Sequence, residues 1–202
     1  MNAAKIQISA EELALIEDAG WILTKNGIIH KLFDLFGMLA GETANLLQAS
    51  GLPEEIKKST AKISRGEQYK GLPYVVLDYP RVFTKQDVFA IRILFWWAHY
   101  FSLTWHLKGV YLERFGSYIT DNLDLLASHD FYLSISADEW QHELNEQHYV
   151  KIREVNKQEV DKILIHHPFV KLSVKIPLGK WNQAGSLLLE QFSVVMRISE
   201  QR

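Results

Sequence analysis

The sequence predicts an α+β fold: a mainly antiparallel sheet with an N-terminal α-hairpin and a C-terminal helix packed on it. Three observations predict this class. Apolar residues alternate over a nineteen-residue stretch, helical stripes occur near both ends, and the β-type runs follow one another without strict β–α–β alternation. A length of 202 residues suits one domain, residues 1–202, with a helical part (1–60) and a sheet-containing part (63–202).

The first sixty residues predict two helices that form an α-hairpin. Ser9 and Glu12 have the spacing of a capping box, so a helix should begin there. We expect it to end near Lys25, where Asn26-Gly27 supplies a left-handed cap. A second helix should extend from residue 28 to residue 49, because its apolar residues recur every three or four positions.

The next segment, residues 64–81, is rich in Gly, Pro and Tyr. It predicts a loop, a short strand over Tyr74–Leu77 and a second loop.

The alternating stretch follows, and it predicts a hairpin. Of the ten odd-numbered residues from Phe89 to Leu107, nine are apolar. One straight strand of this length would extend about 60 Å, far beyond the diameter of a compact chain whose radius of gyration is about 16–17 Å. A three-residue loop, Trp97 to His99, keeps apolar residues opposite one another, whereas a two-residue loop mixes the two faces. The expected pairs are Trp96/Tyr100, Phe95/Phe101, Ile93/Leu103, Ile91/Trp105 and Phe89/Leu107.

This hairpin has two competing interpretations. Its loop lacks the Gly, Asn, Asp or Pro that turns favour, so a bulged continuous strand is one alternative. A helix capped by Thr84 or Asp87 is the other.

The last hundred residues mix helices and strands. For residues 140–152 the sequence fits a helix and a strand equally well. Lys171, Ser173 and Lys175 should point outward from the late strand, as on a guarded sheet edge. The expected elements are a helix over 110–126, a strand over 131–135, a helix over 156–166, a strand over 170–176 and a helix over 181–198.

Composition argues against several classes of protein. The formal net charge of −2 lacks the basic excess of a nucleic-acid binder. With no cysteine, disulfides and thiolate sites are excluded. Residues 1–9 lack the apolar core of a signal peptide, and the most apolar window, Val88–Leu103, is too short to span a membrane. We therefore expect a soluble, cytoplasmic protein.

Two groups of residues are candidate ligand sites. The first comprises Tyr69, Tyr74, Asp78, Tyr79 and Arg81, where Asp78 and Arg81 would form a polar pair at the mouth of an aromatic-walled pocket. The alternative is that Asp78 and Pro80 form a turn and the tyrosines pack.

The second candidate is the even-numbered face of the hairpin, with Arg92, Trp96 and His106 as its ligand-binding residues. It is too apolar for a fully solvated surface. It suits a ligand cavity or the interface of a homodimer, since Trp, Tyr and Arg are frequent interface anchors. The alternative is that the N-terminal helices cover it.

No catalytic or metal-binding motif occurs. The spacing of His142 and His148 does not match the zinc helix motif, and a site would need histidines from distant segments, such as His106 with His142. No cofactor is indicated. The leading hypothesis is non-catalytic binding of a small apolar or aromatic ligand; the alternatives are a homodimeric interaction module and an enzyme with scattered Asp, Glu, Tyr and His residues.

Overall fold

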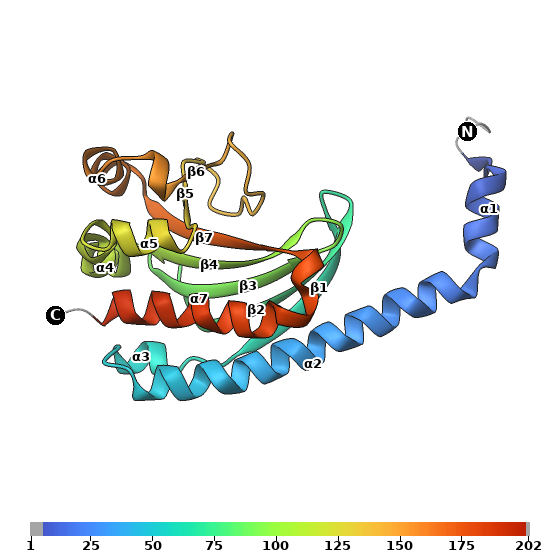
Figure 1. The fold of residues 1–202 in the computed structure, drawn as a ribbon, viewed down its shortest axis with the longest axis horizontal. Helices are drawn as coiled ribbons and strands as arrows, with labels where there is room; N and C mark the ends of the chain where they lie inside the picture. The colour runs from blue at the N-terminus through green and yellow to red at the C-terminus, as the bar shows by residue number, and fades with distance from the viewer. Residues whose placement is uncertain (1–5, 201–202) are drawn as a thin grey trace.

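A computed structural model describes residues 6–200 and contains one antiparallel sheet of seven strands in the order β1-β2-β3-β4-β7-β5-β6 (Figure 1). The strands are β1 (Lys62–Tyr69), β2 (Leu72–Phe83), β3 (Val88–Trp96), β4 (Tyr100–Lys108), β5 (Tyr132–Ser134), β6 (Tyr149–Lys151) and β7 (Phe169–Pro177). N-terminal helices and a C-terminal helix accompany the sheet, which confirms the predicted fold class. The signal-peptide prediction for residues 1–9 includes residues 1–5, which lie outside the described residues.

The hairpin formed by β3 and β4 has the register that residue parity predicts. Phe95 faces Phe101, Ile93 faces Leu103, and the remaining expected pairs are also present. The three-residue loop is closed by a hydrogen bond from His99 N to Trp96 O (3.1 Å), and Ala98 adopts a left-handed conformation with φ of 61°. A left-handed alanine costs about 1–2 kcal/mol. The loop therefore forms without the usual turn residues, but at this energetic cost.

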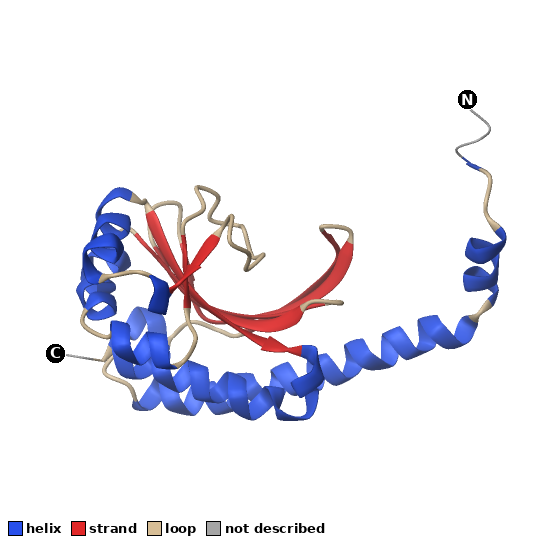
Figure 2. Cartoon of the chain, turned by 45° about the horizontal axis from the view of Figure 1, so that its top comes forward, coloured by secondary structure: helices blue, strands red, loops and turns tan. Residues whose placement is uncertain are grey.

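The helices cover one face of the sheet. The long helix α2 and the C-terminal helix α7 lie along its convex side, and the sheet curves away from them (Figure 2). Their apolar stripes contact the odd-numbered side chains of β3 and β4 in the main hydrophobic core. The helices are α1 (Ala10–Glu17), α2 (Ala19–Ala49), α3 (Glu54–Lys57), α4 (Val110–Thr120), α5 (Leu123–Ser128), α6 (Lys157–His166) and α7 (Ala184–Ser199), with short 3₁₀ helices η2 (Ile152–Glu154) and η3 (Leu178–Gln183).

The N-terminal helices meet at Asp18 rather than at Asn26-Gly27, so the predicted boundary is wrong. The Asp18 carboxylate accepts a hydrogen bond from Gly20 N (2.8 Å) and caps α2. Gly27 lies within α2 with open space around it, and the apolar stripe continues through that position. In contrast, none of the residues of α1 is buried.

The segment predicted as a loop, a short strand and a loop is a full β-hairpin, β1 and β2. Its two-residue turn, Lys70-Gly71, has positive φ at both positions (51° and 79°), which matches the right-handed twist of the strands. The sequence did not predict this turn because only Gly71 is a typical residue for positive φ, and Lys70 is not.

Two predictions about the second half also need correction. The ambiguous segment 140–152 is mainly a loop, followed by β6 and η2. Strand β7 lies between β4 and β5 rather than at an edge, and Lys171 is 1% exposed. A strand of this apolar character is typical of a sheet interior, and the lysine is satisfied there by backbone carbonyls.

The remaining helices lie close to their predicted positions. Asn156 and Glu159 form the capping box of α6. The helix expected over residues 110–126 is divided into α4 and α5, and the last helix starts at Ala184, because η3 contains Trp181. None of the helices within residues 6–200 is long and apolar enough to cross a membrane.

Candidate functional site

A polar row crosses the concave face of the sheet and takes one residue from each of the seven strands. Asp78, Arg92 and Thr104 occupy its centre, directly opposite one another on β2, β3 and β4. The complete row is Lys62, Asp78, Arg92, Thr104, Ser173, Tyr132 and Lys151. Parity produces this row, because the odd-numbered neighbours of Arg92 and Thr104 point into the helix-covered core.

Arg92 is the organising residue of this row. Its guanidinium donates to both carboxylate oxygens of Asp78, at 2.7 Å from Nε and 2.9 Å from Nη2. Its remaining Nη1 lies 2.9 Å from Nε2 of His142. A bidentate pair of this kind fixes the plane of the guanidinium.

A loop, residues 135–148, covers the concave face; we call it the strap. Three tyrosine hydroxyls hold it down from the strands. Tyr69 Oη accepts from His142 N (2.8 Å), Tyr100 Oη accepts from Leu144 N (2.8 Å), and Tyr149 Oη donates to Gln141 O (3.0 Å). Burial raises the pKa of Tyr100 to about 12, so this hydroxyl is protonated at neutral pH. Hydrogen bonds therefore tie the strap to β1, β4 and β6.

Lys171 is the most buried charged side chain beneath the strap. Its Nζ donates to the backbone carbonyls of Glu139 (3.1 Å) and Gln141. Burial, together with the nearby positive charge of Arg92, lowers the pKa of Lys171 to about 7.

A small, partly enclosed chamber of about 10 Å³ lies beside Lys171, roughly the room that one water molecule needs. His106 lines it, and burial lowers the pKa of His106 to about 3, so its ring is neutral. Nε2 of His106 has no hydrogen-bond partner within the described part of the chain. His142 also lines the chamber, but Arg92 and Lys171 accompany the two histidines, so the positive charge there disfavours a metal cation.

Across residues 6–200 no three His, Asp or Glu side chains converge as metal ligands do.

An open cleft of about 660 Å³ lies outside the chamber, and Phe83 and Arg92 line both. Five cations and two carboxylates surround this outer cleft. The two carboxylates are already paired, Asp78 with Arg92 and Glu139 with Lys108 (2.9 Å). The charged residues are Lys62, Arg81, Lys85, Arg92, Lys108, Asp78 and Glu139.

The unpaired cations of the outer cleft face an apolar wall. Lys62 and Lys85 have no ion-pair partner among residues 6–200, and Arg81 Nε donates to the carbonyl of Thr60 (2.9 Å). Phe83 is 38% exposed and Trp140 50% exposed, with ring centroids 6.4 Å apart. The cleft thus combines excess positive charge with two accessible aromatic rings.

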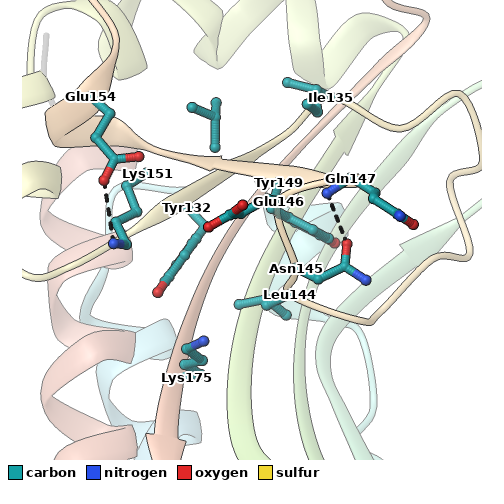
Figure 3. A pocket seen from close by; sticks show the side chains of 11 residues that line it. Tyr132, Ile135, Leu144, Asn145, Glu146, Gln147, Tyr149, Lys151, Glu154 and Lys175 are labelled. Carbon is teal, nitrogen blue, oxygen red and sulfur yellow. Dashed lines mark hydrogen bonds and ion pairs between the residues drawn. The ribbon is translucent and has the colours of Figure 1, made fainter.

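A second cleft, of about 700 Å³, lies between the strap and β6 (Figure 3). Its charges are balanced: Lys151 pairs with Glu154 (3.3 Å), and Lys175 Nζ lies 5.2 Å from the centre of the Tyr132 ring. Asn145 Oδ1 accepts from Gln147 N (3.1 Å), as Figure 3 shows. Because its two lysines and two glutamates leave no excess charge, this cleft is the weaker candidate.

The structure brings together only some of the predicted site residues. Asp78, Arg81 and Arg92 line the outer cleft, and His106 lies in the chamber behind it. Tyr69 and Trp96 pack edge to face, with ring centroids 5.0 Å apart, in a small buried cluster that also includes Tyr74. Tyr79 belongs to the helix-covered core instead.

Sequence reasoning missed Trp140, Lys171 and the lysines of the outer cleft. It named His142 only as a distant partner of His106 in a metal site, and both histidines line the chamber. Lys171 had a detectable signal, since it interrupts an apolar strand. Its place in the chamber depends on the register of β4 and β7, which puts Lys171 opposite His106. No local sequence pattern shows this register.

Comparisons with protein-family models, curated proteins and solved structures gave no match, so the site itself carries the functional inference.

Proposed function

We propose that this protein binds, without chemical conversion, a small organic anion whose body is apolar or aromatic. The outer cleft is the binding site. The observation that carries the proposal is the set of unpaired cations, Lys62, Lys85 and Arg81, around the exposed rings of Phe83 and Trp140.

The charge balance supports an anion as ligand. Both carboxylates of the cleft are held by Arg92 and Lys108, so they do not neutralise the remaining cations. Low-dielectric walls with charge of one sign concentrate ligands of the opposite sign. A carboxylate or a phosphate would accept hydrogen bonds from the lysine and arginine groups.

The aromatic wall supports an apolar body. Phe83 and Trp140 expose ring surface beside the cations, and burying it against a ligand stabilises the complex by about 25 cal/mol per Å². This arrangement fits the predicted binding of a small apolar or aromatic ligand and adds an anionic group to it.

Binding is favoured over catalysis because the titratable groups with shifted pKa values are not in the outer cleft. His106 and Lys171 line the small chamber, where they are 5% and 1% exposed. A general acid or base has to come within hydrogen-bond distance of the reacting proton, and neither of these two side chains lines the open cleft.

Calorimetric titration with phenyl phosphate tests the proposal, with neutral benzamide as the comparison ligand. We expect saturable 1:1 binding of phenyl phosphate that weakens as NaCl is added, and about tenfold weaker binding by Lys85→Glu. Lys180→Glu is the matched control, because it makes the same charge change at an exposed lysine outside the cleft. Equal affinity for benzamide, or equal losses in the two variants, would refute the proposal.

A further inference from the structure

The N-terminal segment, residues 6–23, exposes an unusual amount of apolar surface. Within residues 6–200, eight of the fifteen exposed large hydrophobic side chains lie in this segment. They are Ile6, Ile8, Leu13, Leu15, Ile16, Trp21, Ile22 and Leu23. Figure 1 shows α1 and the start of α2 projecting away from the sheet, and we call this segment the arm.

The helical parts of the arm are well capped, but α1 is not packed against the hydrophobic core. Ser9 and Glu12 complete a capping box at the start of α1, and Asp18 caps α2. An isolated helix of eight residues is marginal in water even with good caps. Since none of the residues of α1 is buried, its helical state calls for a contact outside the chain's own core.

The chemistry of α1 indicates what that contact is. Leu13 and Ile16 are three residues apart and share one face of the helix. Glu12 lies one turn from Ile16, and Glu17 lies one turn from Leu13. An apolar ridge is thus flanked by carboxylates on both sides. This arrangement is complementary to the outer cleft, where lysines flank two exposed rings.

The arm cannot reach its own cleft. The cleft includes Lys108, the last residue of β4, from which the chain passes directly into α4. Figure 1 shows α4 and α1 at opposite ends of the molecule. Two arms are also poor partners for each other, because Glu11, Glu12, Glu17 and Asp18 would repel their counterparts. The same acidic charge disfavours an anionic membrane surface.

We propose that two copies of this chain form a dimer in which the α1 helix of each copy docks in the outer cleft of the other. A reciprocal exchange closes the assembly with two-fold symmetry. The inference deepens the proposed function, because it assigns an acidic amphipathic helix as the macromolecular occupant of the same cleft and rests on that cleft being an anion site.

Analytical ultracentrifugation of the full chain tests the dimer. We expect a mass of twice 23.4 kDa at micromolar concentration. Ile16→Glu and Lys85→Glu should each raise the dissociation constant at least tenfold, and adding Glu17→Lys to Lys85→Glu should recover part of the loss. Ile165→Glu is the matched control, since Ile165 is 76% exposed and Ile16 is 71% exposed.

Mixing the two single variants identifies the contact. Ile16→Glu retains an intact cleft and Lys85→Glu retains an intact arm, so an equimolar mixture keeps one of the two contacts. We expect this mixture to form more dimer than either variant alone. A monomeric wild type, a dimer insensitive to Lys85→Glu, or a mixture without complementation would overturn the arm-to-cleft contact.

The Ile16→Glu variant separates this inference from the proposed function, because its cleft is free, whereas in the wild-type dimer phenyl phosphate would have to displace the docked α1 helix. If it binds phenyl phosphate while the wild type is a monomer, the dimer proposal fails and the anion site stands. If the wild type dimerises as described and Ile16→Glu does not bind phenyl phosphate, the small-anion function fails and the dimer stands.

Discussion

The two faces of this sheet are covered in physically different ways. On the convex face, α2 and α7 bury aromatic and aliphatic side chains against one another in a continuous hydrophobic core. On the concave face, the strap is held by tyrosine hydroxyls, an Arg92–Asp78 pair and a buried lysine. The first face depends on close packing and the second on the pairing of polar groups. Mutations on the convex face should therefore lower stability by leaving cavities, and those on the concave face by leaving polar groups unpaired.

The largest loss of stability should come from the convex face. Phe101 is fully buried and its ring contacts Phe95 and Trp181, so Phe101→Ala should cost about 3–5 kcal/mol through lost burial and a cavity. Urea denaturation measures it. Phe83→Ala, at a partly exposed phenylalanine of the cleft, is the control and should cost less than about 1.5 kcal/mol. Similar losses for both would contradict the proposed division between core and cleft.

Asp78→Asn should give the next largest effect, because it leaves the Arg92 guanidinium short of a buried counter-charge. We expect a loss of about 3 kcal/mol. Replacing the whole pair, Asp78→Leu with Arg92→Met, should recover most of this loss, since apolar residues of similar size can substitute for a buried pair. A double variant as unstable as the single one would show that the pair is not an independent unit.

The buried lysine predicts a pH dependence confined to the concave face. The pKa of Lys171 is lowered to about 7, whereas a lysine in the unfolded chain titrates near about 10.4. Between these values the unfolded state binds more protons, so the free energy of unfolding should rise with pH, by at most about 1.4 kcal/mol per pH unit.

Comparison with Lys171→Met isolates this effect. The wild type should gain stability relative to the variant as the pH increases from 7 to 10, as followed by urea denaturation at each pH. Above pH 10 the raised pKa of Tyr100 acts in the opposite direction in both proteins, because unfolding then releases its proton. Parallel pH profiles would contradict the lowered pKa of Lys171.

The smallest effect should come from the rim of the concave face. Lys70 on the β1–β2 turn pairs with Glu143 of the strap, and both side chains are partly exposed. Lys70→Ala should therefore cost less than about 1 kcal/mol. A loss as large as that of Asp78→Asn would indicate that the rim, rather than the buried pair, holds the strap.

The sequence predicted the convex face far better than the concave one. Parity and chain length were sufficient for the register of β3 and β4, because burying one face leaves no other acceptable pairing. Asp78, Arg81, Arg92 and His106 were identified as polar residues on strands, but their assembly with Lys171 and His142 depends on contacts between residues far apart in the chain.

The strap and strand β7 also show that local sequence patterns do not reveal long-range contacts. Ser136 and Glu139 have capping-box spacing, yet Asp138 accepts from Trp140 N (2.9 Å) and forms a local turn instead of a helix. The alternation of Lys171 and Lys175 with apolar residues is typical of an edge strand, but the pairing of β7 with both β4 and β5 buries Lys171 within the sheet.

The strand order also has a kinetic consequence. Strands β1 to β4 are sequential neighbours, so this meander closes only short loops, whereas β7 must join β4 across about sixty residues of intervening chain. We expect the meander to form the folding nucleus with α2, and the docking of β7 to complete the sheet last. Destabilising substitutions in β3 should accordingly slow refolding, and those in β7 should mainly accelerate unfolding.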